Sequence, residues 1–316
     1  MEHRKLGRSS VRIAPLALGG NVFGWTADAA TSHRILDAFV DGGFNMIDTA
    51  NVYSKWAPGH KGGESETIIG QWLKKSGKRD RVVIATKVGM EMPPDDKGLS
   101  KAYIVRAVEE SLQRLCIDCV DLYFSHTDDA ATPLAETMEA HTQLVRQGKV
   151  RIIGASNFSA ERLAESLAVS KQNGFERYEV LQPLYNLYDR ESYESTLGPL
   201  CVREEVAVTP YYGLASGFLT GKYRTESDLE GRARGGRIKS SYLNERGLTI
   251  LSAIDRVAKA LKATPAQIAL AWLMRRPAIA APIASATSVR QLEELMKAAT
   301  LELDNDMMMV LDGASA

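Results

Sequence analysis

The sequence predicts a (β/α)8 barrel, also called a TIM barrel, and three observations support that fold class. Short apolar, β-branched runs alternate along the 316 residues with segments whose apolar residues recur at helical spacing. Eight such units of similar length indicate parallel strands joined by right-handed helical crossovers. The segment after the first strand, residues 19–24, reads GGNVFG and lacks the GxGxxG spacing of an open dinucleotide-binding sheet. A closed barrel is therefore favoured.

The elements can be taken in chain order. Several of the helices between the expected strands have recognisable N-terminal capping residues. The expected strands are residues 13–18, 45–48, 82–87, 120–125, 152–156, 180–182, 207–209 and 280–283. The expected helix caps are Ser100, Thr132 before Pro133, and two capping boxes, Thr264 with Gln267 and Ser288 with Gln291.

Two segments fall outside the repeating units. Residues 2–5 and 11–13 flank the turn-forming residues 7–10, which predicts an N-terminal β-hairpin covering the barrel floor. Residues 213–247, after the seventh strand, show no sustained apolar period and predict a long loop. We interpret this loop as a mobile, basic lid over an anionic ligand, with surface decoration as the alternative. The whole chain, residues 1–316, is expected to form a single domain.

Composition limits the classes of partner. With 39 basic and 39 acidic residues, the chain gives no electrostatic reason to expect nucleic acid or an anionic membrane as a partner. Neither a secretory signal nor an apolar run of about 18 residues is present. Cys116 and Cys119 form a lone CxxC, and Cys201 is isolated, so ordinary packed thiols are favoured over a zinc or redox site. These features predict a cytoplasmic protein without a metal and leave the oligomeric state open.

Polar residues follow the expected strands at the point where each apolar run ends. In a barrel these positions converge on the C-terminal mouth, where the active site of this architecture lies. Each residue alone has an ordinary structural role as a cap, loop aromatic or surface cation. It is their joint placement that indicates a site. The residues are Asp48, Lys87, His126, Ser156, Asn157, Gln182 and Tyr211.

Four residues suggest a reaction type. Lys87 and Asp48 are costly to bury singly, so we expect them to pair, with the phenol of Tyr53 beside them. The ammonium should lower the pKa of Tyr53 toward that of a useful general acid, and Asp48 should raise the pKa of Lys87. His126 would hold a carbonyl oxygen or share the proton. Such a group protonates an oxygen while another species adds to its carbon.

Four stretches of the chain resemble the aldo-keto reductase family, in particular its bacterial and potassium-channel-β branch. They read GFNMIDTA at 43–50 followed by Tyr53, GKVRIIGASNF at 148–158, GFLTGKY at 217–223 and IASATSVRQLEE at 283–294. The resemblance implies an NAD(P)H-dependent reductase of aldehydes or ketones. By it, Tyr53 is the proton donor, Lys87 and Asp48 tune the donor, and His126 orients the carbonyl.

The same resemblance implies how a nicotinamide cofactor is held. Ser156, Asn157 and Gln182 would bind the carboxamide and Tyr211 would stack on the ring. By the resemblance NADP(H) is expected. NAD(H) is the alternative, because the usual basic residue in the first turns of the helix after Ser288 appears here as Arg290 beside Gln291. Leu295 also stands where the family often has asparagine. The remaining implied contacts are Leu214, Ser216 and Lys222 at the pyrophosphate, Arg232 in the lid, and Ser285, Ser288, Gln291 and Glu294 around the adenosine end.

The sequence gives little information about the identity of the substrate. Trp25, Trp56 and Tyr212 could line an apolar pocket for a small carbonyl compound, or could pack loops. Two other functions stay open: a TIM-barrel lyase that uses Lys87 as a Schiff-base amine, and a cofactor-sensing regulatory subunit of the channel-β type.

Overall fold

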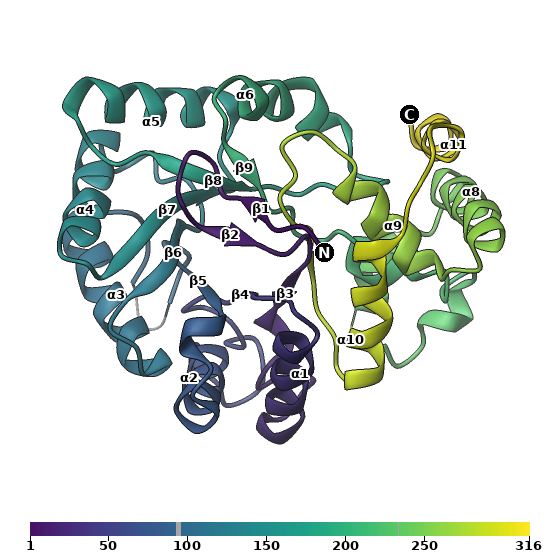
Figure 1. Cartoon of the computed structure of the whole chain (residues 1–316), viewed down its shortest axis with the longest axis horizontal. Coiled ribbons are helices and arrows are strands. Elements are labelled where there is room, and N and C mark those ends of the chain that lie inside the picture. The colour runs from purple at the N-terminus through teal and green to yellow at the C-terminus, as the bar shows by residue number, and fades with distance from the viewer. Residues whose placement is uncertain (93–95, 233) are drawn as a thin grey trace.

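The computed structural model describes residues 1–92, 96–232 and 234–316. Eight parallel strands form one sheet in the order β10-β3-β4-β5-β6-β7-β8-β9. Figure 1 shows this sheet curled into a ring with helices on its outer side. The strands are β3 (Ala17–Gly19), β4 (Met46–Asp48), β5 (Val83–Val88), β6 (Val120–Ser125), β7 (Val150–Ser156), β8 (Tyr178–Gln182), β9 (Ala207–Val208) and β10 (Ile283–Ala284).

Backbone hydrogen bonds close the ring between its first and last strands. Val208 on β9 donates to the carbonyl of Ala278 and accepts from Ala280, both at 2.8 Å. One step further along, Ile283 donates to the carbonyl of Pro210 at 2.9 Å. The predicted (β/α)8 barrel is therefore confirmed.

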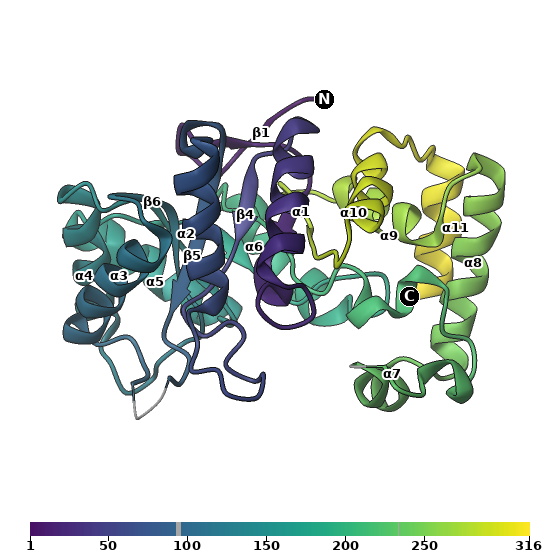
Figure 2. The same ribbon diagram turned by 90° about the horizontal axis from the view of Figure 1, so that it is seen from below.

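Most helices cover the outside of the barrel, and a few lie beyond it. Figure 2 shows α7 at the end of the barrel opposite the N-terminal hairpin, with α8 and α11 on the outer flank. The barrel helices are α1 (Ala29–Asp41), α2 (Glu64–Ser76), α3 (Lys101–Leu115), α4 (Leu134–Arg146), α5 (Ala160–Asn173), α6 (Gly198–Arg203), α9 (Pro265–Met274) and α10 (Val289–Met296). The additional helices are α7 (Gly235–Ser241), α8 (Glu245–Leu261) and α11 (Asn305–Ser315). None of the described helices is both long and apolar enough to cross a membrane.

Each predicted strand is present, with differences at the ends. The fourth predicted strand, 120–125, coincides with β6. The first predicted run, 13–18, is divided: Arg12–Ile13 belongs to the hairpin strand β2, and β3 begins only at Ala17. Pro15 lies between them and has no backbone N–H for a sheet ladder, which explains the break.

The helix caps were predicted with mixed success. The Ser100 hydroxyl accepts from the Tyr103 amide, and the capping box of Thr264 is complete on both sides. Ser288 caps α10, but Oε1 of Gln291 accepts from the Thr287 amide, so the second capping box is only half formed. The Thr132 cap was wrong. Its hydroxyl donates to Asp129 at 2.6 Å, and α4 starts at Leu134 without a side-chain cap.

The N-terminal hairpin, β1 (Arg4–Lys5) paired with β2, covers the barrel floor as expected. Leu6, Val11 and Ile13 are almost completely buried and belong to the same apolar cluster as Met46 and Phe124 from inside the barrel. Apolar burial of this kind stabilises a sealed floor, so the open end of the barrel lies at the carboxyl ends of the strands.

The long segment 213–247, which we call the lid segment, is more ordered than its sequence suggested. It contains two short 3-10 turns, Ala215–Thr220 and Glu226–Leu229, followed by α7 and the start of α8. Apolar anchors explain this order, because Phe218, Leu219, Leu229 and Ile238 are buried. Their spacing is irregular, so no helical period is visible in the sequence.

The three cysteines are free thiols: Cys116 is exposed at the end of α3, Cys119 is half-buried and Cys201 is buried. Within the described ranges, no cluster of three or more His, Cys, Asp or Glu side chains could hold a metal ion.

Candidate active site

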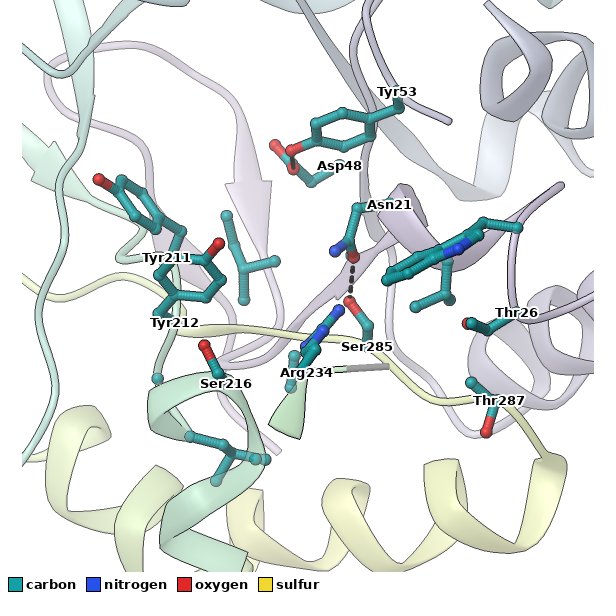
Figure 3. Close-up of a pocket in the computed structure, with 18 of the residues that line it drawn as sticks. Asn21, Thr26, Asp48, Tyr53, Tyr211, Tyr212, Ser216, Arg234, Ser285 and Thr287 are labelled. Atoms are coloured by element: carbon teal, nitrogen blue, oxygen red, sulfur yellow. Dashed lines mark hydrogen bonds between the residues drawn. The ribbon is translucent and has the colours of Figure 1, made fainter. Parts of the chain in front are cut away.

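A cavity of about 1410 Å³ opens at the carboxyl ends of the barrel strands. Figure 3 shows Asp48 and Tyr53 on one side of it, facing Tyr211 and Tyr212 on the other. Three of the four predicted catalytic residues line it, namely Asp48, Tyr53 and His126. All twelve residues predicted for the cofactor line it as well, as do Trp25, Trp56 and Tyr212.

Lys87 lies beneath the cavity wall, where its ammonium group connects Asp48, Thr49 and Tyr53 by hydrogen bonds. Its ammonium nitrogen is within hydrogen-bond distance of three acceptors: Oδ2 of Asp48 at 2.7 Å, the carbonyl of Thr49 at 2.8 Å and the hydroxyl of Tyr53 at 2.9 Å. An ammonium has three donors, so this coordination is complete. The side chain is 0 % exposed, which leaves no open approach for a carbonyl carbon to form a Schiff base.

The pKa directions expected from charge pairing alone were wrong for this pair. Burial raises the pKa of Tyr53 well above its ordinary value, and the neighbouring Asp48 carboxylate raises it further. Burial lowers the pKa of Lys87, and Asp48 only partly opposes that effect. The desolvation of a charged form outweighs its pairing here, because Lys87 is fully buried and Tyr53 is half-buried at the cavity wall. Tyr53 is therefore a protonated phenol at neutral pH.

His126 occupies the mouth beside the phenol, with ring centres 6.1 Å apart. Burial, followed by the charge of Lys87, holds the pKa of His126 well below its usual value. The imidazole is thus neutral at physiological pH. Its Nδ1 atom is buried and has no hydrogen-bond partner in the described part of the chain. A neutral imidazole can still donate one hydrogen bond, from whichever nitrogen carries the proton.

A chain of hydrogen bonds links the other strand ends to Asp48. Gln182 donates from Nε2 to Oδ1 of Asp48 at 2.9 Å, and its backbone carbonyl accepts from the Ser156 hydroxyl at 2.9 Å. Asn157 donates to the carbonyl of His126 at 2.8 Å and accepts from the Tyr211 hydroxyl at 2.8 Å. Asn157 also donates to the Ser156 hydroxyl at 3.2 Å, which joins the ends of five strands, β4, β6, β7, β8 and β9, in one hydrogen-bonded network.

The beginning of the lid segment places at the cavity wall a hydroxyl that no described residue satisfies. Ala215, Ser216 and Gly217 have φ angles of 47°, 60° and 100°, three successive left-handed residues. The amides of Ala215 and Gly217 donate to the carbonyls of Tyr212 at 2.7 Å and Leu214 at 2.8 Å, so this tight turn is held by its own backbone hydrogen bonds. The Ser216 hydroxyl is buried at the cavity wall, and no residue that the structure describes satisfies it. An unsatisfied buried hydroxyl is costly, so this position fits a phosphate oxygen from a ligand.

The far end of the cavity reaches the start of α10. Ser288 caps this helix, and its first turn, with Arg290 and Gln291, lines the cavity. A helix N-terminus next to a guanidinium suits an anionic group. Glu294 is already held by Gln267 and Lys297, and the Ser285 hydroxyl donates to Oδ1 of Asn21 at 2.6 Å. The cavity thus runs from an acid–base cluster, past the buried Ser216 hydroxyl, to a cationic end at Arg290, which fits a dinucleotide.

Comparison with known proteins agrees with this geometry. The sequence profile of the Aldo/keto reductase family matches residues 15–316. The chain is 35% identical to "Uncharacterized oxidoreductase YrpG" of Bacillus subtilis, with 99% of this chain and 95% of the relative covered. It is 33% identical to "Probable voltage-gated potassium channel subunit beta" of Arabidopsis thaliana, covering 94% and 91%, and 32% identical to "Protein tas" of Escherichia coli, covering 98% and 96%.

The chain belongs to the aldo/keto reductase family. It is therefore an oxidoreductase acting on a small molecule, in a family that generally uses NAD(P)H. The predicted resemblance to the bacterial and channel-β branch is confirmed.

Among the polar lining residues that sequence reasoning did not single out are Asn21, Arg234 and Arg237. Asn21 follows the first strand, and its only sequence signal was its place in the loop after that strand end. The two arginines stand in a lid segment rich in basic residues, where composition indicated an anion-binding role for the whole segment without pointing to any one side chain.

Proposed function

We propose that this chain is a single-domain NADPH-dependent reductase of aldehydes or ketones, with Tyr53 as the general acid. One observation carries the proposal: the Tyr53 hydroxyl lines the cavity while bonded from behind by the Lys87 ammonium. In the resting site the Tyr53 hydroxyl donates to Oδ2 of Asp48 at 3.2 Å, and rotation about its C–O bond turns the proton toward a carbonyl oxygen in the cavity. The Lys87 ammonium is then in place to stabilise the phenolate left after transfer.

The route of the proton follows from the hydrogen bonds. Tyr53 gives its proton to the carbonyl oxygen as that oxygen gains negative charge. Lys87 stays charged and shortens its contact with the phenolate oxygen, while Asp48 keeps the ammonium in place. Neutral His126 offers an N–H to the same carbonyl oxygen and so orients it. His126 is not the acid, because its pKa is too low to carry a second proton at pH 7.

NAD(P)H, when bound, supplies the hydride. The residues that would hold it follow the cavity. Ser156, Asn157 and Gln182 present fixed amide and hydroxyl groups beside Tyr211, where the reactive ring would lie. The Ser216 hydroxyl, with Lys222 and Arg232, would take the pyrophosphate. Ser285, Ser288, Gln291 and Glu294 would surround the adenosine end, and Arg290 supplies the cation that a 2′-phosphate requires.

The test is a set of aldehydes and ketones assayed by oxidation of NADPH, with NADH run beside it. We expect turnover with NADPH, and a loss of about 10²- to 10⁴-fold in kcat in Tyr53→Phe. Fluorescence titration should show that Tyr53→Phe still binds the cofactor. Turnover that survives this substitution would remove Tyr53 from its role as acid.

A second candidate, a regulatory subunit with little turnover, is kept because two plant relatives are named as probable potassium channel β subunits. Tight cofactor binding without turnover on any carbonyl compound would favour that function.

A further inference from the structure

Two guanidinium groups lie in the cavity over aromatic rings. The Arg237 guanidinium carbon is 4.4 Å from the ring centre of Tyr212, and its Nη1 donates to the hydroxyl of that residue at 3.1 Å. The Arg234 guanidinium carbon is 5.9 Å from a ring centre of Trp25. Both arginines line the cavity, and Figure 3 shows the Arg234 nitrogens directed into it.

Neither guanidinium is neutralised by the part of the chain that the structure describes. Other lid cations are paired, Arg224 with Asp255 at 2.8 Å and Lys239 with Glu226 at 2.6 Å. No described carboxylate oxygen lies within 4.0 Å of Arg234 or Arg237. Burial is the first of the effects that lower the pKa of Arg234, and the charge of Arg237 adds to it. Arg234 is half-buried and Arg237 is exposed at the cavity rim. Two neighbouring cations at a cavity, one of them partly removed from water and neither paired with a described carboxylate, favour an anionic ligand.

Aromatic contacts place these cations near the reacting groups. Tyr212 packs edge-on against Tyr211, with ring centres 5.2 Å apart. On the other side, Trp25 contacts Trp56 at 5.8 Å, and Trp56 contacts Tyr53 at 6.0 Å. Each arginine is therefore joined through aromatic rings to the end of the cavity that holds the proton donor.

We propose that Arg234 and Arg237 recognise an anionic group on the substrate, so that the preferred carbonyl compounds carry a carboxylate or a phosphate. This inference rests on the proposed function. In it, Lys222, Arg232 and Arg290 serve the phosphates of the cofactor, which leaves the two lid arginines for the substrate. Their planar forks match the geometry of both anions, and the Trp25–Trp56 pair covers the apolar body of the substrate.

The experiment compares matched neutral and anionic aldehydes with NADPH. The carboxylate pair is 4-formylbenzoate and its methyl ester, and the phosphate pair is glyceraldehyde 3-phosphate and glyceraldehyde. Wild-type kcat/KM should favour at least one anion by about 10- to 100-fold. Whichever pair shows the preference identifies the anion. Arg234→Met and Arg237→Met should each remove most of it through KM, and Arg234→Lys should restore part of it.

Lys239→Met is the matched control, since it removes one positive charge from the same helix at a side chain that does not line the cavity. It should leave the preference intact. The Kd for NADPH, measured by fluorescence, should change less than about twofold in the arginine variants, given a role confined to the substrate. A tenfold weaker NADPH affinity, or equal losses for neutral and anionic aldehydes, would assign the arginines to the cofactor and overturn the proposal.

Calorimetric titration with terephthalate, a dianion that cannot be reduced, separates this proposal from the proposed function. Saturable binding that Arg234→Met weakens about tenfold supports the anion site even in a protein without turnover. Turnover on neutral aldehydes without terephthalate binding would support the proposed reductase activity and contradict the anion site.

Discussion

Gln182 donates from Nε2 to Oδ1 of Asp48, so the carboxylate is fixed by one neighbouring strand while its other oxygen receives the Lys87 ammonium. Asp48 therefore cannot turn away from Lys87 without leaving a buried amide donor unpaired, at a cost of about 1–3 kcal/mol. Asp48 is also the main group that opposes the lowering of the Lys87 pKa by burial. Asp48, with a smaller contribution from Glu66, therefore favours the charged form of Lys87.

Asp48→Asn should move the alkaline limit of activity to lower pH. In the proposed mechanism Lys87 must be protonated, so the rate falls as the pH rises through the pKa of Lys87. Removing the Asp48 charge lowers that pKa further, and the fall should begin at least about one pH unit earlier. The measurement is kcat against pH. Asp255→Asn, which removes an exposed carboxylate paired with Arg224, is the control and should leave the profile unchanged. An unshifted limit in Asp48→Asn would show that Lys87 does not govern it.

Arg290→Gln should lower the affinity for NADPH and leave that for NADH nearly unchanged. The exposed guanidinium lies in the first turn of α10 at the end of the cavity, where it would meet only the 2′-phosphate. The loss of one charge-assisted contact of this kind is worth about 1.5–3 kcal/mol, roughly 10- to 100-fold in Kd. Fluorescence titration with both cofactors measures the two Kd values. An equal loss of affinity for NADH would show that Arg290 does not act on the 2′-phosphate.

His141 should make the fold sensitive to mild acid. Burial lowers its pKa to about 3, and its Nε2 lies 3.0 Å from the Ser125 hydroxyl. Between that value and the ordinary 6.5, the unfolded chain binds a proton that the folded chain excludes. Stability is therefore complete above pH 6.5 and is lost as the pH falls, by about 2 kcal/mol between pH 7 and pH 5. His126 acts in the same direction and forms part of the background.

Urea unfolding at pH 7 and pH 5 tests this effect. His141→Gln, which does not titrate, should reduce the difference in the free energy of unfolding by about 2 kcal/mol. His3→Gln in the N-terminal segment is the control and should keep the wild-type difference. If the free energy of unfolding differs by the same amount between pH 7 and pH 5 in the wild type and in His141→Gln, another group causes the acid sensitivity.

The parts of the site that could be predicted are those fixed by backbone periodicity. Asp48, Gln182 and Tyr211 follow apolar strands, and a parallel barrel brings strand ends together whatever the side chains are. The pKa directions of Tyr53 and Lys87 could not be predicted, since they depend on how completely folding removes both groups from water. The Thr132 cap failed for a related reason: Asp129, three residues earlier, takes the same hydroxyl.

The lid arginines could not be predicted because their position depends on tertiary packing. Arg237 faces the cavity only because Ile238, the next residue, is buried and fixes the rotation of α7. A helix of seven residues has only about two turns, so the spacing of its apolar residues does not reveal which side faces inward.

Gly70→Ala should destabilise the fold at the contact between α2 and α3. A Cβ atom at Gly70 would lie 2.1 Å from the carbonyl oxygen of Arg114 and 2.7 Å from the carbonyl carbon of Leu115, so the two helices would have to separate. Overpacking against backbone typically costs about 1–3 kcal/mol. Gly313→Ala is the matched control, because this glycine of α11 has no atom within 4 Å of the added carbon. That change should stabilise the helix by about 0.5–1 kcal/mol. Urea unfolding of both variants measures the difference, and equal stabilities would mean that α2 and α3 are not in the close contact described here.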